Sequence, residues 1–383
     1  MHVLFVTGEY PPMAGGVGAY TAALAHALET LGLQVSVMTS RQARPSPPGE
    51  GVAVYPSVRR WDWRIWPGIA RRAREVGADW IHVQYQTGAY GMHPAVNFAP
   101  RWWQRAGLRV AWTYHDLLVP YLFPKAGARL RRWVTEWPAR TSDLVVVTNE
   151  GDRIRLAGRI HPRRLARIPI GSNIPTHPIT EEARRARRES YGYHEETLVV
   201  GYFGFLNRSK GGLTLVRALH ALAQRHPDVR LLMIGERVGA SDPTNYAYLQ
   251  EVEALIRELD LAERVHWTGH QPDGEVSADL AACDVLLMPY EDGASLRRGT
   301  LMAGLAHGCA IVTTTPQDPL PELVDGRDLI YVPPGDPEAA AAAVLQLAAQ
   351  PTWAQNLRAN ARARSDLFRW EAIAAEHVRL YQS

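Results

Sequence analysis

Short apolar runs rich in β-branched residues alternate along the chain with stretches in which apolar residues recur at helical spacing. In the first half, such runs predict strands at residues 3–6, 34–38, 80–83, 109–114 and 144–147. Residues 18–30 predict a helix, because Leu24, Ala27 and Leu28 fall on one face. This alternation is typical of a parallel sheet covered by helices on both faces, in which ligands bind beyond the carboxyl ends of the strands.

The second half shows the same alternation. Its predicted strands are residues 198–203, 230–234, 265–268, 285–289 and 310–314, and its predicted helices are 213–225, 250–258, 276–282, 301–307 and 338–349. Between the halves, residues 171–190 combine Pro and Gly with an Arg- and Glu-rich helix, which indicates a linker. We therefore expect an α/β protein with two doubly wound domains, at 1–178 and 190–365, followed by an amphipathic helix at 366–383.

Composition and charge exclude several classes of protein. The 383 residues include 42 basic and 39 acidic residues, and the net charge of +3 gives no support to nucleic-acid binding. Two cysteines, Cys283 and Cys309, exclude a disulfide scaffold and a four-cysteine zinc site. No apolar run approaches the roughly 20 residues of a membrane span, and residues 1–7 read as a strand rather than a signal peptide. We expect a cytoplasmic protein.

Lysine is rare in this chain. Of the 42 basic residues only Lys125 and Lys210 are lysines, and the rest are arginines. Codon bias explains most of this replacement. A lysine that remains is more often one that is needed, because the planar guanidinium does not replace a compact ammonium.

Tryptophan and arginine gather in the first half, at residues 59–66 and again at 129–133. Trp61, Trp63 and Trp66 alternate there with arginines. Packing with cation–π contacts explains the pattern. A surface that touches a membrane explains it too, since aromatic and basic residues both suit a lipid interface. The second interpretation predicts peripheral membrane contact through this face.

Four segments carry candidate chemistry. Residues 8–18 follow the first strand, and their glycines let backbone N–H groups at a helix start approach an anion. This loop matches neither a dinucleotide fingerprint nor a Walker A loop. Residues 201–212 close the first strand of the second half and place Lys210 beside a helix N-terminus. A cation there repels the helix dipole, and a bound phosphate would compensate it.

The other two segments also follow predicted strands. Residues 289–300 combine acidic residues, a serine and two arginines at a helix start, which suits sugar hydroxyls and phosphate together. His115 ends a strand in the first half, on the ligand side of such a sheet, although a lone histidine is usually structural. His82 ends another strand and is the weaker candidate.

With these segments in view, the chain resembles glycosyltransferase family 4, the retaining enzymes of GT-B fold, over nearly its whole length. The segments that carry the resemblance occur in family order at residues 15–17, 115–116, 168–173, 204–211, 306–312, 333–338 and 370–373. The resemblance implies two Rossmann-like domains facing a central cleft. It places the donor sugar nucleotide mainly against the second domain and the acceptor against the first, with the helix at 366–383 packing back on the first.

The sequence departs from the family pattern at the donor site. Counted from residues 306–308, the two spaced glutamates of the family fall on Ser295 and Ala303, and the arginine that accompanies the lysine falls on Phe205. Glu291 is a candidate replacement for the first glutamate. The chain therefore resembles a divergent branch in which residues 295–300 rebuild the donor site, and Arg208, Arg297 and Arg298 are candidates for the missing charge.

The resemblance and the residues together predict the reaction. We expect metal-independent transfer of a sugar from a nucleoside diphosphate, of UDP or GDP type, to an acceptor hydroxyl with retention, and no other cofactor. No Asp-x-Asp metal motif occurs. The expected catalytic residues are His115, Lys210 and Arg298. The expected donor-binding residues are Gly15, Gly16, Gly204, Asn207, Arg208, Lys210, Glu291, Ser295, Leu296, Arg297, Arg298, Gly299 and Thr300.

Three other functions stay open at this stage. The lost glutamates favour a catalytically inactive GT-B protein that binds a glycan or a partner. A dinucleotide oxidoreductase lacks its G-x-G-x-x-G loop here, and a sugar-nucleotide epimerase has the same general fold. The acceptor is a lipid-linked glycan, a small metabolite or a polysaccharide.

Overall fold

The computed structural model describes residues 1–383 apart from 14, 48, 50, 118–126, 173 and 238–242. The chain forms two compact units. Unit 1 contains Met1–Gly171 and Arg369–Ser383, and unit 2 contains Ser172–Phe368. Lys125 and Asn173, which the sequence singled out, lie outside the described residues.

Unit 1 is built on a seven-stranded parallel sheet in the order β3-β2-β1-β4-β5-β6-β7. Its strands are β1 (His2–Thr7), β2 (Gln34–Ser40), β3 (Ala53–Val58), β4 (Trp80–Tyr85), β5 (Arg109–Tyr114), β6 (Leu144–Val147) and β7 (Leu165–Arg167). Its helices are α1 (Gly16–Thr30), α2 (Ile65–Glu75), α3 (Ala95–Arg105), α4 (Ala128–Thr141), α5 (Glu150–Arg159) and α13 (Trp370–Gln382), with a short 3₁₀ helix η1 (Thr87–Tyr90).

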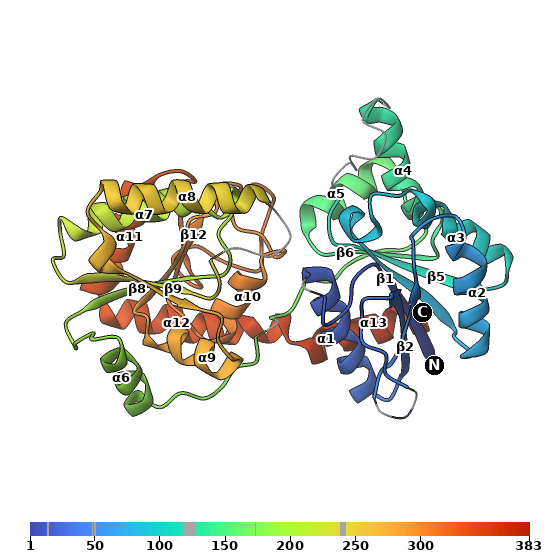
Figure 1. The fold of residues 1–383 in the computed structure, drawn as a ribbon, viewed down its shortest axis with the longest axis horizontal. Helices are drawn as coiled ribbons and strands as arrows, with labels where there is room; N and C mark the ends of the chain where they lie inside the picture. Colours follow the sequence, from blue (N-terminus) through green and yellow to red (C-terminus); the bar gives the residue numbers. More distant parts are fainter. Residues whose placement is uncertain (14, 48, 50, 118–126, 173, 238–242) are drawn as a thin grey trace. The chain divides into compact units, whose positions relative to one another are not determined.

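Alternate residues of the strands enter two separate cores on the two faces of this sheet. In β1, Leu4 packs with α2 and α3, whereas Phe5 packs with α1 and α13. The last helix of the chain thus belongs to the core of unit 1 (Figure 1), where Tyr381 is buried. Both faces are apolar, which is why the strands read as continuous hydrophobic runs.

Unit 2 has a six-stranded parallel sheet in the order β10-β9-β8-β11-β12-β13. Its strands are β8 (Leu198–Phe203), β9 (Val229–Ile234), β10 (Val265–Gly269), β11 (Val285–Met288), β12 (Ile311–Thr314) and β13 (Ile330–Val332). Its helices are α6 (Glu181–Ser190), α7 (Gly212–Ala223), α8 (Pro243–Glu258), α9 (Asp273–Ala282), α10 (Gly299–Ala306), α11 (Pro337–Ala349) and α12 (Pro351–Ser365), with 3₁₀ helices η2 (Arg208–Lys210), η3 (Ala262–Arg264) and η4 (Asp366–Phe368). The predicted fold class, two doubly wound α/β domains, is confirmed.

The polar helix that indicated a linker is α6, and it is fixed to unit 2. Arg187 pairs with Asp279 of α9 at 2.6 Å, and Arg188 pairs with Asp284 at 3.0 Å. The buried Arg188 also donates to the carbonyl of Thr197 at 2.5 Å. Its charge pattern therefore reflects ion pairs with the domain rather than a solvated tether.

Among the residues that the structure describes, no helix is both long enough and apolar enough to cross a bilayer.

Candidate functional site

Two of the segments selected from the sequence meet at the centre of the unit 2 sheet. β8 and β11 are neighbours there, and the strand order runs outward in opposite directions from this pair. Such a reversal leaves a crevice beyond the carboxyl ends of the two strands. Residues 204–211 follow β8, and residues 289–300 follow β11. The structure thus brings both candidate loops to the position where open α/β sheets bind ligands.

The two loops are packed against each other. The backbone N–H of Glu291 donates to the carbonyl of Ser209 at 2.9 Å. Gly211 has φ of 72°, and a Cβ on it would lie 1.8 Å from the Pro289 carbonyl oxygen. Only glycine fits that approach.

Lys210 lies over a second glycine, Gly204, at the end of β8. A Cβ on Gly204 would lie 2.7 Å from Thr300 Cγ2 and 2.9 Å from Lys210 Nζ, and its φ is 106°. The Asn207 side chain fixes the turn, because its Oδ1 accepts from the backbone N–H of Lys210 at 3.1 Å. The Lys210 ammonium and Thr300, at the start of α10, therefore both lie against the backbone of Gly204.

The charge of Lys210 is perturbed by its surroundings. Burial and, to a smaller extent, the neighbouring Arg298 lower the pKa of Lys210 to about 8. In the described part of the chain, no carboxylate lies within ion-pair distance of its ammonium. An anionic ligand would supply the missing partner and raise this pKa again.

Arg298 is the second cation of this site. It pairs with Asp292, donates to Ser209 Oγ at 3.2 Å, and lies 4.8 Å from the centre of the Tyr290 ring. The Tyr290 hydroxyl is 2.8 Å from Thr300 Oγ1. The arginine is the residue immediately before α10, and its guanidinium is held by Asp292 and by Ser209 of the other loop.

The remaining predicted donor-binding residues of unit 2 occupy varied positions. Leu296 is buried in the hydrophobic interior, so only its backbone is available to a ligand. Arg208 is exposed and pairs with Glu251 of α8 at 2.9 Å. The Ser295 side chain accepts from the Arg297 N–H at 3.3 Å. At Gly299 a Cβ would meet no atom within 4 Å, so space is open beside the first turn of α10.

Glu291, the candidate for the missing first glutamate, contacts α7. Its Oε1 accepts a hydrogen bond from Thr214 Oγ1 at 2.7 Å. At the other glutamate position, Ala303 is fully buried in α10.

In unit 1, His115 follows β5 and is held by the neighbouring strand. Its Nε2 lies 3.0 Å from Gln84 Oε1, and its ring stands edge-on to Tyr20 at 4.6 Å. Burial and the nearby His377 lower the pKa of His115 to about 3. The imidazole is therefore neutral at physiological pH, with Nε2–H donated to Gln84 and Nδ1 left as an acceptor.

The glycine loop of unit 1 already holds an anionic group. Glu9 Oε1 accepts from the backbone N–H groups of Val17 at 3.0 Å and Gly18 at 3.2 Å, at the start of α1. A Cβ on Gly15 would lie 2.1 Å from the same carboxylate oxygen, whereas one on Gly16 would meet nothing within 4 Å. An incoming phosphate would therefore find two of the helix N–H groups occupied.

A buried cluster lies behind His115. His82 is 2.5 Å from the Tyr381 hydroxyl and 2.7 Å from Thr113 Oγ1. The His82 and His377 rings are 5.7 Å apart. His82, the weaker sequence candidate, is thus a fully buried core residue that joins β4 to α13.

The structure separates the tryptophans of the Trp- and Arg-rich stretch by their burial. Trp61 is buried, and its indole N–H donates to Ser40 Oγ at 3.0 Å. Trp66 donates to the Ala95 carbonyl at 2.8 Å.

Of the three tryptophans in this stretch, only Trp63 is exposed. The Trp63 ring is tilted against that of Phe98, with ring centres 6.0 Å apart, and the centres of the Phe98 and exposed Trp133 rings are 5.8 Å apart. We call Trp63, Phe98 and Trp133 the aromatic face.

Sequence reasoning missed three residues of these sites: Glu9, Gln84 and Tyr290. Glu9 and Tyr290 lie inside segments that were selected, but their partners depend on tertiary contacts. Gln84 is two residues beyond His82 and directly before the end of β4, and this position was the available signal. In the described residues, no group of three or more His, Cys, Asp or Glu side chains is arranged to hold a metal ion.

Two family models match the chain. The model described as "Glycosyltransferase Family 4" matches residues 14–174, and the model described as "Glycosyl transferases group 1" matches residues 197–350. Together they span most of both units.

Curated relatives match over nearly the full length. One is the "GDP-mannose-dependent alpha-(1-6)-phosphatidylinositol monomannoside mannosyltransferase" of Mycolicibacterium smegmatis, which is 27% identical over 91% of this chain and 90% of that protein. Another is the "D-inositol 3-phosphate glycosyltransferase" of Corynebacterium urealyticum, which is 25% identical over 97% of this chain and 91% of that protein.

Solved structures share the fold. Sucrose-phosphate synthase from Thermosynechococcus elongatus superimposes with a TM-score of 0.75 at 22% identity, over 100% of this chain and 98% of that one. HepE of Anabaena, in complex with UDP and glucose, gives a TM-score of 0.74 at 18% identity, over 100% of this chain and 99% of that one.

Proposed function

Since the chain belongs to glycosyltransferase family 4, we propose that it transfers a sugar from a nucleoside diphosphate sugar, of UDP or GDP type, to an acceptor hydroxyl with retention of configuration. The observation that carries this proposal is the pair of cations at the unit 2 crevice. Lys210 has no carboxylate partner in the described residues, and Arg298 is fixed beside the first turn of α10.

The chemical requirement is to stabilise the departing diphosphate. Negative charge grows on its oxygens as the bond to the sugar breaks, and donors already in place stabilise that charge without reorganising. We assign this task to the Lys210 ammonium, the Arg298 guanidinium and the N–H groups at the start of α10. Gly299 leaves room for the ligand to approach the backbone, and Gly204 leaves room for Lys210 and Thr300. These cationic groups supply positive charge without a metal ion, so we propose metal-independent transfer.

Retention is proposed from family membership. In a front-face reaction, the acceptor oxygen forms its bond on the side from which the diphosphate leaves. A phosphate oxygen of the leaving group takes the acceptor proton. This route needs no pair of carboxylates flanking the sugar, unlike glycoside hydrolysis.

His115 is proposed to bind a sugar hydroxyl. Because burial lowers its pKa to about 3, it acts as a neutral hydrogen-bond acceptor through Nδ1 rather than as a cation. Gln84 is then a positioning residue that fixes the tautomer.

For the acceptor, we propose a molecule carried on a lipid. The name of the Mycolicibacterium smegmatis relative includes phosphatidylinositol monomannoside, and the aromatic face of unit 1 has exposed rings that suit a membrane surface. Trp63 and Trp133 would then lie at the lipid interface, where aromatic side chains are favoured.

A catalytically inactive binding protein is the second candidate. The observation that favours it is the substitution of the two family glutamates by Ser295 and the buried Ala303. Ala303 has no polar group with which to hold a nucleotide ribose.

A thermal-shift panel distinguishes the two. The protein is heated with UDP, GDP, ADP, their common sugar conjugates and NAD. A ligand at about 100 times its dissociation constant stabilises the native state by roughly 2.7 kcal/mol. Stabilisation by one nucleoside diphosphate and its sugar conjugate supports the transferase and identifies the donor class. If no nucleotide raises the melting temperature, the transferase proposal is contradicted and the catalytically inactive binding protein is favoured.

A further inference from the structure

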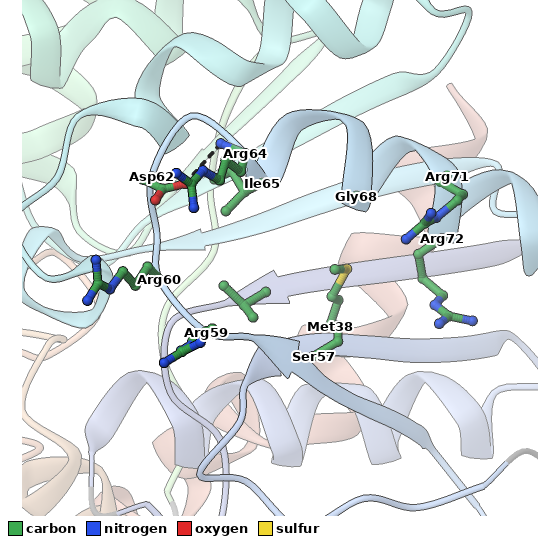
Figure 2. A pocket seen from close by; sticks show the side chains of 11 residues that line it. Met38, Ser57, Arg59, Arg60, Asp62, Arg64, Ile65, Gly68, Arg71 and Arg72 are labelled. Atoms are coloured by element: carbon green, nitrogen blue, oxygen red, sulfur yellow. Dashed lines mark hydrogen bonds between the residues drawn. The ribbon is translucent and has the colours of Figure 1, made fainter.

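A groove of about 410 Å³ lies in unit 1 between the end of β3 and α2. Figure 2 shows Arg59 and Arg60 at one end of it and Arg71 and Arg72 at the other, with Met38 between them. The groove uses none of the residues assigned above to the donor or to His115.

Basic side chains dominate the lining. Five of the eleven lining residues are arginines, and Asp62 is the single acidic one. One Asp62 oxygen is already engaged, because it accepts the backbone N–H of Arg64 at 3.0 Å. The lining therefore has a strong excess of positive charge, in a chain whose net charge is only +3.

The arginines divide into two groups. Arg72 pairs with Glu75 at 2.8 Å and lies 4.3 Å from the centre of the Tyr55 ring, and Arg71 shares Glu75 at 3.8 Å. By contrast, no ion pair joins Arg59, Arg60 or Arg64 to any of the described residues, and all three side chains are exposed. Three like charges thus line one groove without an acidic partner.

Part of the groove lining is apolar. Met38, Val58 and Ile65 are buried apolar residues beneath it. Gly68 faces it from the middle of α2, and a Cβ there would meet no atom within 4 Å. Glycine is unfavourable inside a helix relative to alanine, and here its absent side chain keeps the groove open.

We infer that this groove binds a phosphate-bearing ligand through Arg59, Arg60 and Arg64. The guanidinium fork matches phosphate oxygens in bidentate geometry, and several forks around one cavity match the several oxygens of a phosphate or diphosphate. A bound phosphate also removes the mutual repulsion of the three arginines. This site goes beyond the proposed function, because it lies in unit 1 and does not depend on transfer.

The same phosphate chemistry has two sources, a soluble phosphorylated molecule and a phospholipid headgroup. Trp63 lies between Asp62 and Arg64 in the chain and is exposed. Its ring would allow a headgroup in the groove to remain attached to a bilayer. The experiment therefore needs a soluble probe and a vesicle probe.

The test compares two triple variants in the Lys210→Ala background, which removes the proposed donor site. The groove variant is Arg59→Gln/Arg60→Gln/Arg64→Gln. The matched control is Arg185→Gln/Arg217→Gln/Arg257→Gln, which removes the same charge from exposed positions of unit 2. Binding of pyrophosphate is measured by calorimetry at low salt. Binding to vesicles is measured by co-sedimentation, with phosphatidylcholine alone and with equal parts of phosphatidylcholine and phosphatidylinositol.

We expect the groove variant to lose at least about tenfold in affinity relative to the control for one or both probes, since each lost contact is a charge-assisted hydrogen bond. Gly68→Glu, which fills the groove and reverses its charge, should do the same. Loss for pyrophosphate alone identifies a soluble ligand, and loss for the phosphatidylinositol vesicles identifies a headgroup. Equal binding by the two triple variants overturns the inference, and so does the absence of binding to both probes by the Lys210→Ala parent. The proposed function is tested separately, and it fails if the Lys210→Ala variant binds nucleotides as tightly as the wild-type protein does.

Discussion

The Glu9 carboxylate accepts a hydrogen bond from the Val17 backbone N–H at 3.0 Å, so the first turn of α1 is already capped by an anion from its own loop. The bond satisfies a free N–H and opposes the positive end of the helix dipole. Glu9→Ala should therefore lower the free energy of unfolding by about 1 kcal/mol, measured by urea denaturation. Glu9→Gln keeps an acceptor and should lose less. Equal stability of all three proteins would mean that this cap contributes nothing.

Gly204→Ala should disturb the nucleotide site directly. The new Cβ would meet Thr300 Cγ2 at 2.7 Å and Lys210 Nζ at 2.9 Å, so the lysine must move. We expect about tenfold weaker binding of a nucleoside diphosphate, as for one lost charged hydrogen bond. Gly269→Ala is the control, because Gly269 also has a positive φ of 71° but open space around its Cβ position. Gly269→Ala should lower the free energy of unfolding but leave the nucleotide affinity unchanged. Similar nucleotide affinities for the two variants would show that Lys210 does not contact the nucleotide.

Lys210 gives the nucleotide affinity a pH dependence. Its pKa in the free protein is about 8 because of burial and Arg298, and a bound diphosphate raises it. The lysine is charged below this pKa, so affinity is fully present below about pH 8 and falls as pH rises above it, by up to about tenfold per pH unit. Calorimetry between pH 7 and pH 10 measures the fall. Lys210→Ala should show a flat profile, and a flat wild-type profile would exclude the lysine as the titrating group.

The buried histidines of unit 1 should make it acid-labile. Burial lowers the pKa of His377 to about 4 and that of His115 to about 3, and it lowers the pKa of His82 too. In the unfolded chain these groups titrate near about 6.5, so below that pH the unfolded state binds more protons. The free energy of unfolding contributed by these neutral histidines is therefore fully present above about pH 6.5 and is lost as the pH falls toward 4. His377→Gln should reduce the slope by about 1.4 kcal/mol per pH unit, in urea unfolding from pH 4 to pH 7. An unchanged slope would contradict this.

Arg188 should anchor α6 to unit 2. Its guanidinium pairs with Asp284 at 3.0 Å and donates to the Ala282 carbonyl at 2.9 Å. Arg188→Ala leaves the carbonyls of Ala282 and Thr197 without their donor, while Asp284 keeps Arg184 at 2.8 Å. We expect a loss of about 1–3 kcal/mol. Arg185→Ala, on the exposed side of the same helix, should change stability little. If both variants unfold alike in urea, α6 is not held through Arg188.

The sequence predicted what depends on local pattern. The apolar runs located β8 and β11, and since both carry ligand loops at their carboxyl ends, the segments around Lys210 and Arg298 were found in advance. The scarcity of lysine singled out Lys210 independently of any fold. The confirmed fold class follows from the same alternation of strands and helices.

Other features depend on tertiary contacts that no local pattern reveals. Trp61 and Trp63 are two residues apart, yet one is buried against Tyr90 and the other is exposed. The Pro and Gly residues and the polar helix α6 indicated a linker, but Arg184 and Arg187 of this helix pair with aspartates 100 and 92 residues away. Gln84 contacts His115 only because β4 and β5 are neighbours in register.

The most direct test of the account is a calorimetric titration of the wild-type protein and Lys210→Ala with UDP and with GDP at pH 7. If Lys210 holds the diphosphate of a sugar nucleotide, the wild type binds one of the two, and the variant binds it at least about tenfold more weakly. Equal affinities in the two proteins, or no binding of either nucleotide to the wild type, would contradict the proposed donor site.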